Sequence, residues 1–249
     1  MSRRFYLPQA LDVPRVFLQG REAHHLTNVL RGKLGDEVLL FDGNGIEARA
    51  RIVGLQPSGA ADGGGTAELE ILSHGPAESE TRQPIILATA VPKGDRFEWL
   101  VEKATELGVS RLIPLVTDRS IVNPGEGKLD KLRNTVIAAS KQCRRSRLME
   151  ITAPLSWSHF LTQEAGAGQL YMADPSGESM GSQRWGTDRP IILTIGPEGG
   201  FTEREISAAV AAGAGLVSLG PRILRIETAA VALAAVVGAC LESSDTSQS

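Results

Sequence analysis

Cysteines and long apolar runs are scarce in this chain, and each shortage argues against a class of protein. The 249 residues include two cysteines, Cys143 and Cys240, which lie far apart and lack the spacing of metal ligands. We therefore expect a reducing compartment, no disulfide and no bound metal. No apolar run is as long as a membrane span, and the N-terminal sequence MSRRFYLP lacks the apolar core of a signal peptide. These absences predict a cytoplasmic protein.

An excess of positive charge is also absent. Lysine and arginine total 26 against 29 aspartate and glutamate residues, which gives a formal net charge of −3. Any contact with nucleic acid must therefore come from local basic patches. The hydrophobic content of 42% and the charged content of 22% are ordinary for a globular protein, and 249 residues suffice for one large domain or two modest ones.

The two common phosphate-binding motifs are missing, but a pair of glycine-proline loops is present. The loop 196–200, in IGPEGG, follows neither GxGxxG with a later acidic residue nor GxxxxGK[ST]. It comes after the apolar run Ile191–Ile195, which predicts a strand buried on both faces of a parallel sheet. A second short strand, predicted at 216–219, leads into Gly220-Pro221 and an alanine-rich helix.

Both loops are expected at the carboxyl ends of their strands, where open α/β sheets bind ligands. Side by side they would form one pocket lined mainly by backbone groups. For each loop alone, an ordinary tight turn is the alternative. The three glycines of IGPEGG favour a bare backbone that a ligand can approach closely. Thr202 and Glu205 form a capping-box pattern, which predicts that the following helix begins near Glu203.

The N-terminal part, residues 1–73, is predicted to be a small β-barrel. Its short apolar or alternating segments predict strands at 15–18, 37–41, 46–53 and 67–71. Residues 42–45, DGNG, predict a hairpin between two of them, and a helical piece is expected between Gly20 and Gly35. Residues 56–66 read as a surface loop, and the polar stretch 74–84 as an interdomain linker.

Residues 85–241 alternate between predicted strands and helices, which indicates a parallel sheet. Strands are expected at 85–91, 112–116 and 170–173, and an amphipathic helix at 128–147. Asp95 and Glu98 form a further capping-box pattern. The near-continuous apolar stretch 229–239 predicts a helix buried on several sides. The polar tail 242–249 is expected to be disordered.

Basic residues gather at two places that are candidates for RNA contact. Near the N-terminus they stand beside Phe5 and Tyr6, a pattern that suits phosphate contact and base stacking, although a solvated charged face is the alternative. The adjacent His24 and His25 cannot both face one side of a helix, so we expect one to pack and one to be exposed. The second group lies at the end of the helix predicted at 128–147, where it can serve the helix dipole or RNA phosphates. The two groups comprise Arg3, Arg4, Arg31, Lys33, Arg49 and Arg51, and Lys141, Arg144, Arg145 and Arg147.

Several motifs together resemble the RsmE family of 16S ribosomal RNA methyltransferases, within the SPOUT (trefoil-knot) superfamily. The strongest are IGPEGGFTEREI and LGPRILRIETAAVAL; RRF, EAHHLTNVLR, GDEVLLFDGNG, KGDRFEWLVEKATELGV and QCRR extend the likeness over nearly the whole chain. The resemblance implies an α/β SPOUT trefoil-knot domain with a parallel sheet, preceded by a PUA-like RNA-binding β-barrel. It further implies a homodimer that uses S-adenosylmethionine to methylate N3 of a specific uridine in 16S rRNA of the small ribosomal subunit.

The resemblance also implies site residues. Backbone groups of knotted loops would hold the cofactor, at Ala173, Ile195, Gly196, Pro197, Gly199, Gly200, Ser218, Leu219, Gly220, Ile223, Leu224 and Arg225. RNA contacts would come from Arg3, Arg4, His25, Arg31, Lys93, Arg96 and Arg144. For Arg96, a charge on a helix surface is the alternative.

For the chemistry, we expect Arg225 to stabilise negative charge on the uracil oxygens. Glu198 would accept the N3 proton if burial makes it basic enough; capping the next helix is an equal alternative for this carboxylate. Glu227 would hold Arg222 or Arg225 in place. The rival functions are a knotted methyltransferase for tRNA or a ribose hydroxyl, and a non-catalytic RNA-binding protein of ribosome assembly.

Overall fold

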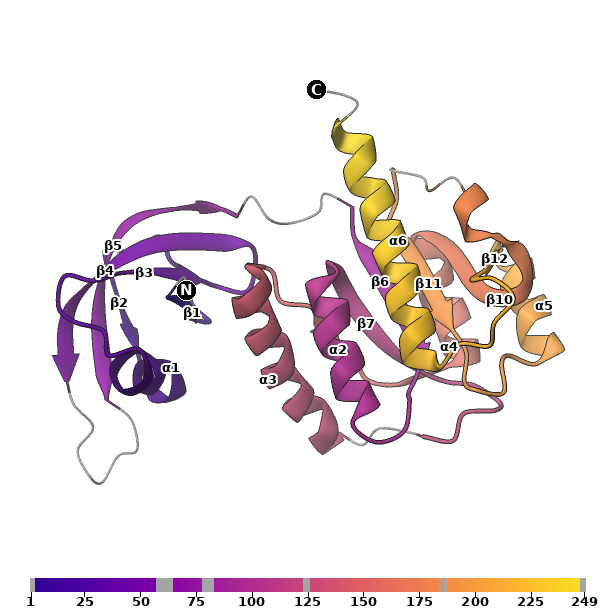
Figure 1. The fold of residues 1–249 in the computed structure, drawn as a ribbon, viewed down its shortest axis with the longest axis horizontal. Coiled ribbons are helices and arrows are strands. Elements are labelled where there is room, and N and C mark those ends of the chain that lie inside the picture. Colours follow the sequence, from indigo (N-terminus) through magenta and orange to yellow (C-terminus); the bar gives the residue numbers. More distant parts are fainter. Residues whose placement is uncertain are drawn as a thin grey trace. The chain divides into compact units, whose positions relative to one another are not determined.

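The computed structural model describes residues 3–56, 65–77, 83–122, 126–183, 185 and 188–246. The chain divides into two compact units (Figure 1). The first comprises Met1–Glu80 together with Ser140–Leu148, and the second comprises Thr81–Ala139 together with Met149–Ser249. Because the first unit takes up a segment from the middle of the chain, the predicted domain boundaries at 73 and 84 do not describe it fully.

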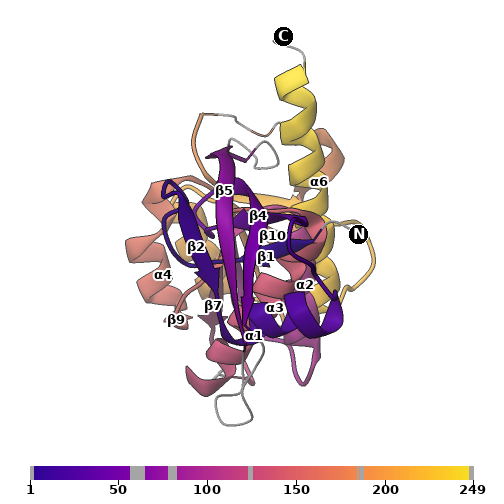
Figure 2. The same ribbon diagram turned by 90° about the vertical axis from the view of Figure 1, so that its left-hand side faces the viewer.

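The N-terminal unit contains a curled five-stranded sheet with the order β1-β3-β4-β5-β2 (Figure 2). Only β1 and β3 pair in parallel; the other neighbours are antiparallel. The strands are β1 (Arg4–Tyr6), β2 (Arg15–Leu18), β3 (Glu37–Phe41), β4 (Ile46–Gln56) and β5 (Thr66–Pro76). All four predicted strands are confirmed, while β1 is too short to show a pattern.

Two of the strands run beyond the predicted bounds. β4 continues to Gln56, and β5 continues to Pro76 and so takes up the first residues of the predicted linker. Residues 57–64 of the predicted surface loop and 78–82 of the linker lie outside the described residues.

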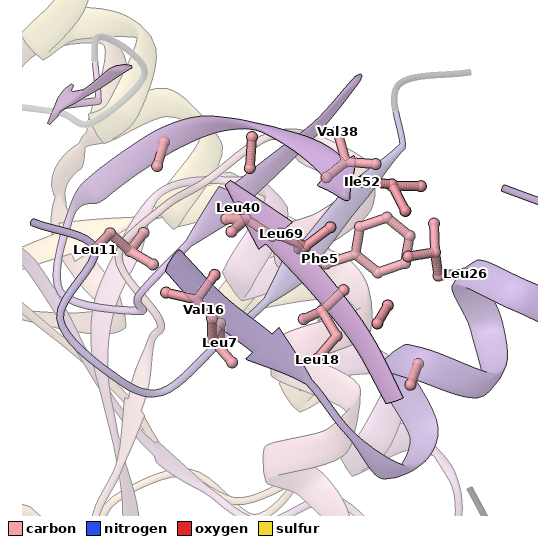
Figure 3. Close-up of a cluster of buried hydrophobic side chains, with 14 residues drawn as sticks. Phe5, Leu7, Leu11, Val16, Leu18, Leu26, Val38, Leu40, Ile52 and Leu69 are labelled. Carbon is pink, nitrogen blue, oxygen red and sulfur yellow. The ribbon is translucent and has the colours of Figure 1, made fainter. Parts of the chain in front are cut away.

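The predicted helical piece is an α-helical turn, α1 (Gly20–His24), that continues as a π-helix, η1 (His25–Val29). It closes one side of a core made by inward-facing side chains of every strand. Phe5, Leu26 and Leu40 are fully buried there (Figure 3). Leu26 also leaves little room for a side chain at position 32, because a Cβ on Gly32 would lie 2.9 Å from the Leu26 Cδ1 atom. Burial of these apolar side chains is the main stabilisation of the unit.

The segment Ser140–Leu148 completes the N-terminal unit through polar contacts. Arg4 donates to Glu47 Oε1 at 2.6 Å, to the carbonyl oxygen of Arg145 at 2.8 Å, and to the hydroxyl of Ser146. The backbone N–H of Leu148 donates to the carbonyl oxygen of Gly43 at 2.9 Å, so the segment adds to the hairpin turn. These bonds pair both terminal nitrogens of a buried guanidinium, which would otherwise be costly, while its Nε atom is buried without a partner among the described residues.

The second unit contains a parallel sheet with the order β12-β10-β11-β6-β7-β8, and β9 pairs with β7. The strands are β6 (Ile85–Ala90), β7 (Val109–Val116), β8 (Glu150–Ile151), β9 (Leu155–Ser156), β10 (Gln169–Ser179), β11 (Ile191–Ile195) and β12 (Gly215–Ser218). The helices are α2 (Arg96–Glu106), α3 (Glu126–Cys143), α4 (Trp157–Gln163), α5 (Glu203–Ala211) and α6 (Ile226–Thr246), with short 3₁₀ turns η2 (Ala165–Ala167) and η3 (Met180–Ser182).

Helices cover both faces of this sheet, which is why its central strands are buried throughout. Every residue of β6 and of β11 is buried. Trp157 and Phe160 of α4 and Ala209 of α5 pack on one set of alternating side chains, including Ile86 and Ile192. α2 and α6 contact each other, and they cover β6, β7 and β11 (Figure 1). The predicted class, an α/β unit with a parallel sheet preceded by a small β unit, is confirmed.

Two helix boundaries differ from prediction. α3 ends at Cys143, four residues early, because Arg144 adopts a left-handed backbone with φ 67°. α6 continues to Thr246, so the expectation of a disordered tail from 242 is wrong up to that residue, and 247–249 lie outside the described residues. The buried side of α6 follows a helical repeat at Ile226, Ala229, Ala230, Leu233, Ala234 and Val237. No helix among the described residues is long and apolar enough to cross a membrane.

Candidate active site

The parallel register brings the carboxyl ends of four strands to one edge of the sheet. Met172 of β10 lies opposite Thr194 of β11 and Leu216 of β12, and Ile195 lies opposite Thr89 of β6. The loops that follow β6, β10, β11 and β12 therefore start side by side. The two glycine-proline loops thus start at the same edge, as expected, but on strands separated by β10, and the ends of β10 and β6 lie at that edge as well.

β10 differs from prediction at this edge. The strand was expected to end at Ala173 but continues to Ser179, and its pairing with β12 skips from Ala173 to Glu178. Asp174 holds the intervening bulge, because its Oδ1 atom accepts from the backbone N–H of Ser176 at 2.9 Å. At Gly177 the backbones nearly touch: a Cβ there would lie 2.5 Å from the backbone nitrogen of Val217. Gly177 therefore permits the close approach of β10 and β12.

The loop after β7 is hydrogen-bonded to the loop 196–200. Arg119 donates from Nη1 to the carbonyl oxygen of Gly199 at 2.6 Å. The backbone N–H of Asp118 donates to Oε1 of Glu205, at 2.9 Å, while Glu205 and Thr202 form the predicted capping box of α5. Arg119 was not among the predicted site residues. Its position just after a strand end was the available signal.

The glycines of the two loops have reasons within the protein. A Cβ at Gly196 would lie 2.9 Å from the ring of Phe201, and Gly200 has a φ of +69°. Gly220 has a φ of +95°, with no atom within 4 Å of its added Cβ. Positive φ favours glycine whether or not a ligand binds. The glycines of these loops therefore do not by themselves indicate a ligand, although both loops expose backbone to solvent.

The twelve predicted cofactor residues lie at this edge, nine on the loops and three in the strands (Ala173, Ile195 and Ser218), but with different exposure. Ile195 and Pro197 are buried. Gly199, Gly200, Gly220 and Arg225 are exposed, and so is Ile223, with 96% of its surface in solvent. The remaining residues are half-buried: Ala173, Gly196, Ser218, Leu219 and Leu224. The site is thus an exposed stretch of backbone at the end of the sheet, flanked by the side chains of Ile223 and Arg225.

A cluster of one cation and two carboxylates lies where these loops meet the helices. Arg96, at the start of α2, places Nη1 3.4 Å from Oε1 of Glu227 and Nη2 4.0 Å from Oε1 of Glu198. The side chain of Glu198 is 44% exposed, whereas that of Glu227 is 8% exposed. Arg96 is therefore engaged inside the unit, both as a partner of Glu227 and through a bond from its Nε to the carbonyl oxygen of Lys93 at 3.2 Å.

Three expectations change with this cluster. Glu227 pairs with Arg96, not with Arg222 or Arg225, which are both exposed. Glu198 does not cap α5, because Thr202 and Glu205 occupy that cap. Glu198 is also exposed rather than buried as its proposed role had required. Within the described part of the chain, no hydrogen bond or ion pair to the Arg225 guanidinium is found.

In the N-terminal unit, Arg4 is withdrawn from the predicted RNA contacts. Its side chain is 2% exposed, and its guanidinium lies 4.6 Å from the centre of the Phe41 ring. Arg3 is half-buried and pairs with Asp36. Hydrogen bonds from the Lys33 backbone and from Arg3 lower the pKa of Asp36 below its ordinary value. Arg31 is exposed, with a φ of 51°.

The histidine pair behaves as predicted, with His24 exposed and His25 half-buried. The ring of His25 packs edge-on against Phe5 at 5.8 Å, and its Nδ1 atom lies 3.4 Å from Nζ of Lys141. Burial, and then the charge of Lys141, lower the pKa of His25. His25 is thus chiefly a packing residue of this unit.

The second basic group is split by the early end of α3. Lys141 is in the last turn, where it pairs with Glu22 at 2.9 Å. Arg144 and Arg147 are exposed beyond the helix, whereas Arg145 is buried. The explanation by the helix dipole therefore fails for these arginines. In the second unit, Lys93 is exposed beside Arg96. Across the described ranges, no cluster of His, Cys, Asp and Glu could hold a metal ion.

Comparisons with known proteins agree with both units. Residues 79–238 match the family model described as RNA methyltransferase domain, and residues 18–60 match the one described as RNA methyltransferase PUA domain. The chain is 36% identical to the ribosomal RNA small subunit methyltransferase E of Synechocystis, over 95% of this chain and 77% of that protein. The enzyme of the same name from Bacillus subtilis is 28% identical, over 89% and 88% of the two chains.

Among solved structures, similarity extends over almost the whole chain. The crystal structure of a ribosomal RNA small subunit methyltransferase E from Neisseria gonorrhoeae, bound to S-adenosyl methionine, superposes with a TM-score of 0.85 at 32% identity. The match covers 96% of this chain and 98% of that one.

Proposed function

This chain belongs to the ribosomal RNA small subunit methyltransferase E family, and we propose that it transfers the methyl group of S-adenosylmethionine to N3 of a specific uridine in 16S rRNA. The observation that carries the proposal is the edge where the loops after β10, β11 and β12 start side by side. Its support comes from relatives that bear this enzyme name and from a similar structure with S-adenosyl methionine bound. The position N3 rests on the sequence motifs alone.

The cofactor would be held by the backbone of the loops 195–200 and 218–225, with Ala173 as a third wall. The exposed Gly199, Gly200 and Gly220 bring to this edge a backbone that a nucleoside can approach closely. The N–H groups of Gly200 and Gly220 already donate to the Pro197 carbonyl at 2.8 Å and to the Ser218 hydroxyl at 3.3 Å, so a nucleoside would bond to other backbone groups of these loops. When bound, S-adenosylmethionine supplies an electrophilic methyl group. The protein must then align N3 with that group and exclude water. Arg119 contributes to this alignment by fixing the Gly199 carbonyl.

Arg225 and Glu198 are the proposed chemical groups. The Arg225 guanidinium is exposed at the end of its loop, so it can approach the uracil oxygens and stabilise the charge that develops there. Glu198 has access to solvent, so it can take the N3 proton and release it to water. Replacement of Arg225 by alanine should abolish transfer while binding of the cofactor persists; unchanged transfer would remove Arg225 from this role.

RNA contacts are proposed for each unit separately. In the N-terminal unit the exposed Arg31 and Arg144 and the half-buried Arg3 and His25 remain candidates; in the second unit Lys93 is the exposed one, with Arg96 held beside it. Contacts of this kind bind phosphates and release counterions. Removal of one of the exposed cations should therefore weaken RNA binding and reduce its dependence on salt.

A homodimer in the cytoplasm is the proposed state. The side of α6 that does not face the sheet carries the half-buried Val231, Ala232, Ala235 and Val236. Small apolar residues at this spacing suit close packing against a second copy. Light scattering of the purified protein at several concentrations tests the dimer, since a mass of one chain at all of them would contradict it.

The decisive experiment is methyl transfer from labelled S-adenosylmethionine to small ribosomal subunits from a strain that lacks this enzyme. Digestion of the product RNA and chromatography then identify the labelled nucleoside. N3-methyluridine at a single position supports the proposal. Label on a ribose, or on tRNA but not on the subunits, would indicate a methyltransferase of another specificity. Neither transfer nor cofactor binding would favour an RNA-binding protein without catalysis.

A further inference from the structure

One buried carboxylate oxygen beside the cofactor loops has no hydrogen-bond donor. Glu227 is 6% exposed, and its Oε1 atom faces Arg96, while its Oε2 atom is buried without a partner. A buried acceptor left without a donor costs stability, and a charged one costs most. Such an atom in a site is therefore a candidate for a bond that a ligand completes.

The charge around this atom selects the kind of donor. Glu198 and Glu227 carry two negative charges against the single positive charge of Arg96. These three groups together carry one excess negative charge, which favours a cationic donor. The cluster also lies beside the proposed cofactor loops, because Glu198 belongs to the loop after β11 and Glu227 follows the loop after β12.

We propose that Oε2 of Glu227 accepts a hydrogen bond from the α-ammonium group in the amino-acid part of S-adenosylmethionine. This inference rests on the cofactor site proposed above. Arg96 acts as a positioning residue, since it engages Oε1 and leaves Oε2 for the ligand. Glu198 adds negative charge at the rim of the cluster, where solvent screens it more strongly. The ammonium combines a positive charge with N–H donors, so it satisfies the oxygen and balances the cluster at once.

Two other donors could satisfy the same oxygen, and they differ in what they predict. A buried water would make Glu227 indifferent to the cofactor. The N3–H of the substrate uracil would make Glu227 matter for transfer but not for cofactor binding. The uracil N–H carries no charge before it reacts, so it would leave the excess negative charge of the cluster unbalanced.

The test compares two nucleosides that differ in the amino-acid part. S-adenosylhomocysteine carries the α-ammonium group, whereas 5′-methylthioadenosine has the same adenosine and thioether without it. Calorimetry on the full-length protein should show that Glu227→Gln lowers the affinity for S-adenosylhomocysteine by roughly ten- to a hundredfold. This is the range for a hydrogen bond to a charged group. Binding of 5′-methylthioadenosine should change less than twofold. Glu203→Gln, an exposed carboxylate in the first turn of α5, is the matched control and should change neither.

Each other outcome has a definite meaning. Equal losses for both nucleosides would show a structural role for Glu227, and no loss for either together with unchanged methyl transfer would show that a water fills the site; both overturn the inference. Unchanged binding of S-adenosylhomocysteine with lost methyl transfer would assign Glu227 to the RNA substrate instead, which also overturns it. If Glu227→Gln weakens the binding of S-adenosylhomocysteine alone, yet the wild type transfers no methyl group to small subunits, the inference stands and the proposed function fails.

Discussion

Arg119 donates from its guanidinium to the carbonyl oxygen of Gly199 at 2.6 Å and so connects the loop after β7 to the loop after β11. The same nitrogen lies 3.4 Å from the carbonyl oxygen of Phe201. One cation thus holds two carbonyl groups of a loop that is otherwise exposed from Glu198 to Gly200. The shape of the proposed cofactor loop depends on a side chain about 80 residues away in the sequence.

We expect Arg119→Ala to weaken binding of S-adenosylmethionine by about tenfold, since one charge-assisted hydrogen bond that orders the loop is lost. Calorimetry measures this affinity. Arg189→Ala is the matched control, because Arg189 also donates to a backbone carbonyl, that of Gly166 at 2.7 Å, but away from this loop. If the two variants bind the cofactor equally well, Arg119 does not organise the site.

Gly177→Ala should disrupt the edge of the sheet. The added Cβ would lie 2.5 Å from backbone atoms of β12, which cannot move aside as a side chain can. We expect a loss of unfolding free energy of about 1–3 kcal/mol or more, together with weaker cofactor binding as β12 shifts. Gly181→Ala is the control, since the nearest atom to its added Cβ is a side-chain oxygen at 3.9 Å. Equal denaturation midpoints for the two variants would contradict this account.

Local patterns in the sequence predicted structure well where the partner of each residue was local too. The capping box of Thr202 and Glu205 forms as predicted, because both residues belong to one helical turn. The same pattern at Asp95 and Glu98 fails. Asp95 makes no capping bond, and Glu98 instead binds Lys131 and Thr135 of α3. Three-residue spacing cannot reveal such competition from a distant helix.

The site shows the same division. The strand ends and both glycine-proline loops follow from apolar runs and turn residues, so their meeting at one edge was predictable. The partner of Glu227 was not, since Arg96 lies 131 positions away, and nearer arginines were the obvious candidates. The early end of α3 was hidden as well, because an arginine rather than a glycine takes the left-handed conformation at residue 144.

Arg4→Met should destabilise the N-terminal unit strongly. The buried guanidinium binds Glu47, the Arg145 carbonyl and Ser146; its loss removes these three bonds and leaves the Glu47 carboxylate without its positive partner. Breaking a buried pair from one side costs about 3–5 kcal/mol. Denaturant unfolding followed by far-UV circular dichroism measures the change. Arg15→Met, which breaks the exposed pair with Glu68, should cost less than about 1 kcal/mol. Similar costs for both would mean that the segment Ser140–Leu148 does not depend on Arg4.

Stability of the N-terminal unit should fall in mild acid, with His25 as one cause. Burial, and then Lys141, lower the pKa of His25, so the unfolded chain takes up the proton more readily than the folded one. Stability then rises with pH, is fully present above about pH 6.5, the ordinary pKa of histidine, and is lost as the pH falls below it. Structurally, a protonated Nδ1 would face the ammonium of Lys141 at 3.4 Å.

His25→Asn removes this titration, so its denaturation midpoint should change less between pH 7.5 and 5.5 than that of the wild type. The control His159→Asn, at an exposed position on α4, should keep the full dependence. A His25 variant with the same dependence as the wild type would place the acid sensitivity on other groups.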